Sequence, residues 1–236
     1  MSGEKPAATR SVCSLSPLNS QYILSVTTRL PIFPLQVVLF PNVQLPLHIF
    51  EERYRILIGR CISESKPFGV VCHRGETIKR VGCAAAVSRV IQTYDDGSLD
   101  IIALGRERFV IDKIDDSGMY LEADVHFLRD AAEAGGDNGD LTDRAVEELL
   151  TYGRFTRIPL DREVLSKLTA DQLSFLIAGI DVFGLETKQE LLELGPAGRR
   201  LQWAVARLAR VNSRLASERH LRTALNRTVD IDSFTN

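Results

Sequence analysis

Four prolines break the most apolar stretch of the chain, residues 30–58, and this constrains the fold more than any other feature. Each proline lacks a backbone N–H and has a fixed φ, so the stretch cannot form one long strand or helix. The four are Pro31, Pro34, Pro41 and Pro46. We expect a short strand at 29–33, an extended turn, a second strand at 43–50, and a helix that begins at Glu51. Such a stretch must be buried by the rest of the chain, and it contains no plausible catalytic set.

Short β-prone segments follow this stretch, and turn signals separate them. Asp96-Gly97 lies between two β-prone arms and predicts a type I′ turn, in which both central residues have positive φ. Asp115 to Gly118 marks the next turn. Strands at intervals of 8–12 residues predict a closed or nearly closed antiparallel β-barrel over residues 29–129.

The composition changes after the predicted barrel. Residues 130–140 are small, acidic and glycine-rich, which predicts a flexible linker. Apolar residues then recur with the helical period over 141–225, and two capping boxes, Thr169 with Gln172 and Thr187 with Glu190, mark helix starts. We therefore predict an α+β fold, a β-barrel followed by a helical bundle, between tails at 1–28 and 226–236.

Charge and cysteine content narrow the class of protein. A net charge of −2 argues against a general nucleic-acid binder. Four cysteines without a disulfide framework indicate reduced thiols and a cytoplasmic location. No apolar run approaches the roughly 20 residues of a membrane span. The tail at 1–28 contains a single acid, Glu4, so a cleaved organellar peptide is the alternative to a disordered tail.

The chemistry-bearing residues do not form a recognisable catalytic or metal site. Cys61, Cys72, His73 and Cys83 are about ten residues apart, whereas zinc ligands usually come in pairs two to four residues apart. We interpret these cysteines as buried structural thiols. The pair Ser166-Lys167 is interpreted as chance, because neighbours on a helix point about 100° apart. We predict no metal, no cofactor and no enzymatic activity.

A series of short motifs follows along the chain in the order Leu30-Pro31, Phe33-Pro34-Leu35, Val38-Leu39-Phe40-Pro41, Ile49-Phe50-Glu51-Glu52-Arg53-Tyr54, Phe68-Gly69-Val70-Val71 and Gly105-Arg106. In this order they resemble the N-terminal, substrate-binding domain of the Lon ATP-dependent proteases. The resemblance covers about residues 29–216 and implies a PUA-like barrel followed by a helical bundle. The segment 49–54 resembles short, free-standing bacterial members of the family. Because the chain has no G-x-x-x-x-G-K-[ST] motif, the resemblance does not imply ATPase or protease activity.

The resemblance implies a non-catalytic protein that binds exposed apolar or unfolded polypeptide segments, as an adaptor or regulator in protein quality control. An ATP-dependent protease is then a candidate partner. We predict that the proline-rich loop contributes Leu35, Val38, Phe40 and Pro41 to the binding surface. The alternative is that these residues fill the end of the barrel. The competing function is RNA binding, since PUA-like barrels also occur in RNA-binding proteins, but the acidic net charge makes a nucleic-acid partner unexpected.

A second candidate surface lies on the last predicted helix, where Trp203 and Arg207 share one face with three further arginines. These are Arg200, Arg210 and Arg214. Tryptophan and arginine are enriched in interface hot spots, so we predict that this stripe contacts an acidic or aromatic partner. The alternative is a solvated basic flank.

Overall fold

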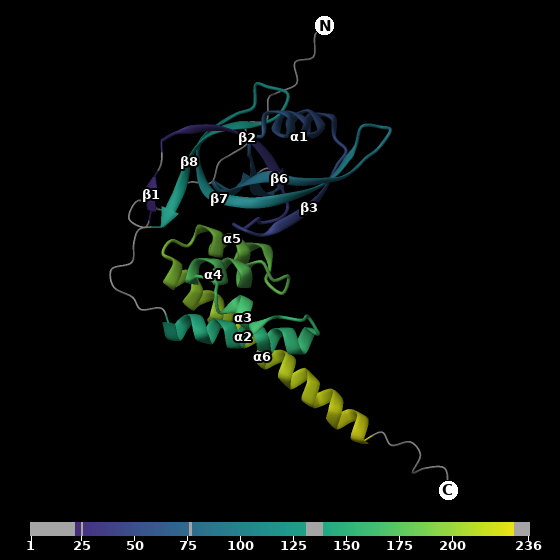
Figure 1. The fold of residues 1–236 in the computed structure, drawn as a ribbon, viewed down its shortest axis with the longest axis vertical. Helices are drawn as coiled ribbons and strands as arrows, with labels where there is room; N and C mark the ends of the chain where they lie inside the picture. The colour runs from purple at the N-terminus through teal and green to yellow at the C-terminus, as the bar shows by residue number, and fades with distance from the viewer. Residues whose placement is uncertain (1–21, 25, 76, 131–138, 229–236) are drawn as a thin grey trace. The chain divides into compact units, whose positions relative to one another are not determined.

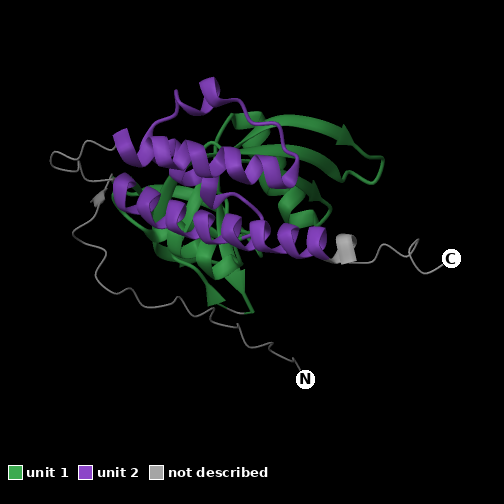
Figure 2. Cartoon of the chain, turned by 90° about the horizontal axis from the view of Figure 1, so that it is seen from below, with its two compact units in different colours: residues 1–132, 183–196 green, residues 133–182, 197–236 purple. Residues whose placement is uncertain are grey.

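A computed structural model describes residues 22–24, 26–75, 77–130 and 139–228 (Figure 1). Parts of the expected tails and linker, at 1–21, 131–138 and 229–236, lie outside the described residues. The chain forms two compact units (Figure 2). The sheet unit comprises residues 1–132 and 183–196, and the helical unit comprises residues 133–182 and 197–236. None of the described helices has both the length and the apolar composition needed to cross a membrane.

The described part of the sheet unit contains eight strands and two helices. The strands are β1 (Tyr22–Leu24), β2 (Thr28–Leu35), β3 (Gln44–Ile49), β4 (Phe68–Arg74), β5 (Thr77–Ile78), β6 (Val81–Thr93), β7 (Leu99–Asp115) and β8 (Glu122–Asp130). The helices are α1 (Glu52–Glu64), which follows β3, and α5 (Leu185–Glu193). As expected, α1 begins at the charged cluster, with Glu51 as its N-cap.

The strands close into a barrel, which confirms the predicted architecture. Strand β8 pairs with β2, β2 with β4, β4 with β6, β6 with β7, and β7 again with β8. The pairing of β2 with β4 is parallel and the other pairings in this ring are antiparallel. Parallel neighbours need a crossover connection, and β3 with α1 supplies it here.

Two prolines lie inside β2, which extends beyond the strand expected at 29–33. Residues 28–31 pair with β8, and residues 32–35 pair with β4 on the other side. Each half of β2 therefore has registered pairing on one side, so Pro31 and Pro34 are accommodated despite their missing N–H groups. The sequence pattern shows the prolines but not this exchange of neighbours.

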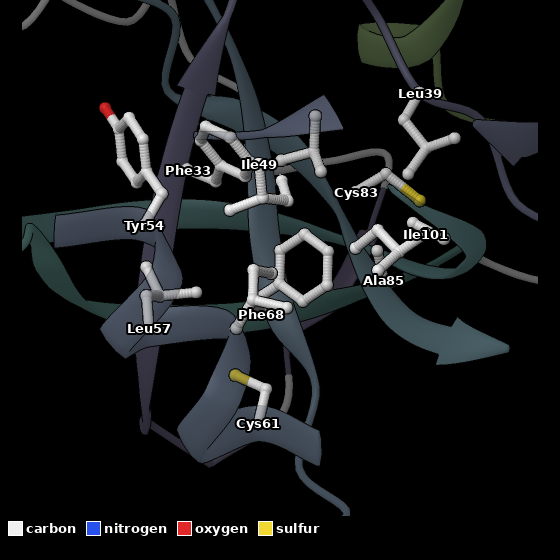
Figure 3. Packing of buried hydrophobic residues seen from close by; sticks show 13 residues of the cluster. Phe33, Leu39, Ile49, Tyr54, Leu57, Cys61, Phe68, Cys83, Ala85 and Ile101 are labelled. Atoms are coloured by element: carbon white, nitrogen blue, oxygen red, sulfur yellow. The ribbon is translucent and has the colours of Figure 1, made fainter. Parts of the chain in front are cut away.

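The proline-broken stretch forms much of the barrel core. Six of the 13 buried residues in one core cluster come from residues 30–58. They are Phe33, Leu39, Ile49, Tyr54, Leu57 and Ile58. Figure 3 shows Phe33 and Ile49 converging on Phe68, which is fully buried. The proline-broken stretch therefore supplies much of the apolar packing inside the barrel.

The turn between β6 and β7 is at the predicted position, but the predicted type I′ conformation is wrong. Gly97 has positive φ and Asp96 does not. Tyr94 N–H donates to the Ser98 carbonyl, and Gly97 N–H donates to the Tyr94 carbonyl, as in a three-residue hairpin loop. The Asp96 carboxylate also accepts hydrogen bonds from the backbone N–H and hydroxyl of Ser98. These local bonds favour the three-residue loop.

The described part of the helical unit contains α2 (Gly139–Thr156), α3 (Arg162–Leu165), α4 (Ala170–Ala178) and α6 (Ala197–Thr228). Helix α6 packs against both α2 and α4, so this part of the chain is a helical bundle as predicted. The capping box of Thr169 with Gln172 is confirmed at the start of α4.

Helix α5 lies in the helical part of the sequence but belongs to the sheet unit. The side-chain amide of Gln189 donates to the Val81 carbonyl (3.0 Å), and buried Arg108 donates to the carbonyls of Leu192 (2.8 Å) and Leu194 (2.9 Å). These long-range hydrogen bonds attach α5 to β6 and β7. The capping box predicted at Thr187 is wrong, because the N-cap of α5 is Gly184, three residues earlier.

Candidate functional site

A cavity of about 390 Å³ opens on the sheet unit, next to the start of α1. We call it the β3 groove, and eleven of its 14 lining residues come from the proline-broken stretch. The lining residues are Phe33, Pro34, Leu35, Gln36, Leu47, His48, Ile49, Phe50, Glu51, Arg53, Tyr54, His73, Gly75 and Ile78. The volume falls in the range of small-molecule and side-chain pockets.

Aromatic side chains form the inner part of the β3 groove. The rings of Phe33 and Tyr54 are 4.1 Å apart between centroids, and both residues are buried. Arg53 places its guanidinium carbon 4.6 Å from the Tyr54 ring centroid, and it also pairs with Glu51 (2.6 Å). The guanidinium of Arg53 is thus held by the Tyr54 ring and the Glu51 carboxylate, beside the apolar side chains of Phe33 and Leu35.

The rim of the groove carries an exposed aromatic side chain. Phe50 is 65% exposed, and its ring is stacked with that of His48 at 5.8 Å between centroids. His48 Nδ1 lies 2.7 Å from an Asp100 carboxylate oxygen, and the Tyr94 hydroxyl donates to the other oxygen (2.6 Å). Hydrogen bonds from Tyr94 and then from His48 lower the pKa of Asp100, while the same carboxylate raises the pKa of Tyr94. This network fixes His48, and His48 in turn supports Phe50.

Strand β3 gives the groove a backbone edge. In the described part of the chain, β3 pairs with β7 alone. Gly105 N–H donates to the Val43 carbonyl, so the alternation of an antiparallel ladder directs the backbone groups of Leu45 and Leu47 toward β7. The groups of Gln44, Pro46 and His48 then face away from β7. Pro46 fits this side because it has no N–H that the ladder would require.

The structure separates the four residues predicted in the proline-rich loop. Leu35 is half-buried and lines the groove, whereas Val38 is half-buried and outside it. The expectation that Phe40 is partly uncovered is wrong: it is 1% exposed, and Pro41 is also buried. The physical reason is the close approach of Gly105, where an added Cβ would lie 2.0 Å from the Phe40 carbonyl oxygen. Phe40 and Pro41 are therefore buried and do not contribute to an exposed binding surface.

The second predicted surface lies on α6, in the helical unit. Trp203 is half-buried, and the Arg207 guanidinium carbon lies 3.7 Å from its ring centroid. Arg210 and Arg214 are exposed on the same helix. Arg200 does not belong to an exposed stripe, because it is fully buried and ion-paired with Asp171.

The described cysteines are buried and form no disulfide. Cys61, Cys72 and Cys83 are free thiols, and burial raises the pKa of Cys61 to about 11 and that of Cys83 to about 12. Such thiols are poor nucleophiles near neutral pH. Among the residues that the structure describes, no group of three or more His, Cys, Asp or Glu side chains is arranged to hold a metal ion.

Sequence reasoning missed Phe50, the most exposed apolar residue of the groove. Phe50 precedes the N-cap of α1, a position whose apolar side chain usually packs on the residue five positions later. That residue is Arg55, so the apolar pair that would cover Phe50 is missing here. The missing partner is a signal in the sequence that predicts an exposed aromatic ring.

Comparison with known proteins identifies the family. A sequence model of the ATP-dependent protease La (LON) substrate-binding domain matches residues 29–210. A Lon protease of Parabacteroides distasonis is 29% identical over 148 residues (59% of this chain and 17% of the relative), and one of Cytophaga hutchinsonii is 25% identical over 222 residues (85% and 26%). The chain thus spans less than a third of the length of these relatives. The crystal structure of a Lon N-terminal domain protein from Xanthomonas campestris has a TM-score of 0.59 and 23% identity, covering 76% of this chain and 98% of that one, and shows the same fold.

Proposed function

The chain belongs to the family of the ATP-dependent protease La (LON) substrate-binding domain, and we propose that its β3 groove binds extended apolar segments of unfolded polypeptides. One observation carries the proposal: the groove places an exposed aromatic residue, Phe50, beside a cavity of about 390 Å³ whose lining includes the apolar side chains of Phe33 and Leu35. Exposed aromatic surface next to a cavity is typical of binding sites on soluble domains.

The backbone edge of β3 supports a preference for extended segments. A segment that lies along this edge forms main-chain hydrogen bonds with Gln44 and His48, which are independent of its sequence. Alternate side chains of the segment then enter the cavity between Leu35 and Phe50. This combination suits a site that accepts many sequences with apolar side chains in common.

We propose that the protein acts without catalysis of its own, as an adaptor or regulator in protein quality control. Among the described residues that line the groove there is no serine, threonine, cysteine or lysine that would serve as a nucleophile. Delivery of bound polypeptides to an ATP-dependent protease is the role that the family suggests. The free thiols of Cys61, Cys72 and Cys83 are consistent with work in the cytoplasm.

The test replaces Phe50 and measures binding to a permanently unfolded protein, reduced and carboxymethylated α-lactalbumin, by fluorescence anisotropy. Phe50 is exposed, so Phe50→Ser is expected to leave the fold intact. Partial burial of one phenylalanine contributes about 1–2 kcal/mol, so the Kd is expected to rise about tenfold. Met119→Ser is the matched control, because Met119 is 67% exposed and does not line the groove. If Phe50→Ser and the unaltered protein bind the unfolded protein with equal affinity, the groove is not the binding site.

The same titration separates this function from RNA binding. Among the described lining residues, the carboxylate and guanidinium groups are those of Glu51 and Arg53, which pair with each other. We therefore expect affinity for the unfolded protein to change little between 50 and 200 mM salt. A single-stranded RNA probe that binds with a steep loss of affinity over the same range would support the competing function.

A further inference from the structure

Helix α6 is rich in positively charged side chains, in contrast to the chain as a whole. It contains eight arginines and one glutamate, while the whole chain has a net charge of −2. Arg200 is buried within the helical unit, but Arg199, Arg210, Arg214, Arg219 and Arg222 are exposed. Helix α6 is therefore strongly basic, although the net charge of the chain is slightly negative.

Three of these arginines share one helix face with two apolar residues. Trp203, Arg207, Arg210 and Arg214 are spaced by four, three and four residues, which places them in one row about 16 Å long. Leu221 lies five turns after Trp203, about 27 Å along the helix, and is 64% exposed. We call this row, with Leu221 at its end, the α6 stripe.

The first part of the α6 stripe is held in place before any partner arrives. Arg207 lies over the Trp203 ring at 3.7 Å, and both side chains are half-buried. Stacking restricts the arginine side chain, so less conformational entropy is lost when the guanidinium binds a carboxylate. Further along the row, the Arg214 side chain is 72% exposed, and its Nε lies 3.4 Å from a Glu218 carboxylate oxygen. Such an exposed ion pair is weak, so a partner's carboxylate can replace Glu218.

We propose that the α6 stripe docks an acidic, amphipathic segment of a partner polypeptide, with carboxylates on Arg207, Arg210 and Arg214 and apolar side chains on Trp203 and Leu221. Charge complementarity selects an acidic partner. The two apolar residues in the row favour a polypeptide over a nucleic acid, because a phosphate backbone gains nothing from Leu221. Arg207 already covers one face of the Trp203 indole, which reduces the ring surface on which a base could stack.

This inference goes beyond the proposed groove function and does not depend on it. The stripe lies on the helical unit and the groove on the sheet unit. A protein that binds an unfolded polypeptide at one site and an acidic partner at another is able to connect the two molecules.

The single tryptophan of the chain makes the stripe directly observable, because intrinsic tryptophan fluorescence reports Trp203 alone. The probe is a synthetic 22-residue helical peptide without tryptophan or tyrosine, with glutamates on both flanks of a leucine face. At 20 mM salt we expect saturable binding to the full chain, a shift in Trp203 emission, and protection of Trp203 from acrylamide quenching. The same peptide with lysine in place of glutamate is expected not to bind.

The variants compare two equal losses of charge on the same helix. Arg210→Gln with Arg214→Gln is expected to weaken peptide binding about fivefold, since exposed charge pairs contribute a few tenths to about 1 kcal/mol each. Arg219→Gln with Arg222→Gln, off the stripe, is expected to stay within twofold. Equal weakening by both pairs, unchanged Trp203 emission at saturation, or tighter binding of a 20-base-pair DNA duplex would each overturn the proposal. The two sites are independent if the stripe variants still bind carboxymethylated α-lactalbumin and Phe50→Ser still binds the acidic peptide.

Discussion

Replacing Asp171 by alanine is expected to destabilise the helical unit much more than the loss of a half-exposed carboxylate normally does. Asp171 is paired with Arg200, whose side chain is fully buried. The Arg200 Nε also donates to the Ser174 hydroxyl (2.8 Å), and its guanidinium carbon lies 4.1 Å from the Phe175 ring centroid. Asp171→Ala therefore removes a counter-charge from a buried guanidinium.

The magnitude follows from comparing the two ends of this pair. An exposed ion pair contributes at most about 1 kcal/mol, and an acid in the first turn of a helix contributes about 0.3–1 kcal/mol. A buried charge that loses its partner costs about 3–5 kcal/mol. Because Ser174 and Phe175 still contact Arg200, we expect Asp171→Ala to lower the free energy of unfolding by about 3 kcal/mol. Arg200→Met removes the buried charge while filling the space, and it is expected to cost about 1–2 kcal/mol.

Urea denaturation, followed by circular dichroism and by Trp203 fluorescence, measures these costs in a double-mutant cycle. The double variant Asp171→Ala with Arg200→Met is expected to be at least as stable as Asp171→Ala alone, which gives a coupling energy of at least about 1–2 kcal/mol. Asp140→Ala is the control, since Asp140 is exposed in the first turn of α2 and is expected to cost no more than about 1 kcal/mol. A loss below 1 kcal/mol for Asp171→Ala, or costs that simply add, would refute the reasoning.

Two further predictions concern the sheet unit. Gly105→Ala is expected to lower the free energy of unfolding by about 3 kcal/mol or more, because its Cβ would lie 2.0 Å from the Phe40 carbonyl oxygen. Gly59→Ala is the control: its Cβ would meet open space, so it is expected to stabilise α1 slightly. Equal melting temperatures of the two variants would contradict this prediction. Hydrogen bonds from Ser117 and then from Arg29 lower the pKa of Asp115, so the unaltered protein should melt above Asp115→Asn at pH 7, with a gap that shrinks below about pH 4 as the carboxylate is protonated. A gap that widens on acidification would be the wrong sign.

Local signals in the sequence were sufficient for most of the elements. The turn at Asp96-Gly97, the cap at Thr169 and the alternation of the strands each depend on residues a few positions apart, and such patterns can be interpreted without the fold. The assignment of α5 depends instead on hydrogen bonds from Gln189 and Arg108 to residues about 85 to 110 positions away. Nothing in the helical period of α5 distinguishes it from the helices of the bundle.

The candidate site shows the same division between local and long-range information. The absence of an apolar partner at Arg55 is local, so the exposure of Phe50 was predictable from the sequence. The burial of Phe40 depends on Gly105, 65 positions later, and the burial of Arg200 depends on Asp171 and Phe175 from another helix. The apolar or charged character of a residue was therefore not enough to predict that Phe40 and Arg200 are buried.

The prolines that define the opening stretch also limit what the β3 edge can bind. An unprotected edge strand adjacent to apolar surface is a template for aggregation. Pro46 interrupts the donors on that edge and leaves those of Gln44 and His48 on either side. A bound segment therefore forms a few main-chain hydrogen bonds but cannot extend a continuous ladder. Short, reversible contacts of this kind fit a site that holds an unfolded chain and then releases it, which connects the residues that organise the barrel to the binding function proposed for it.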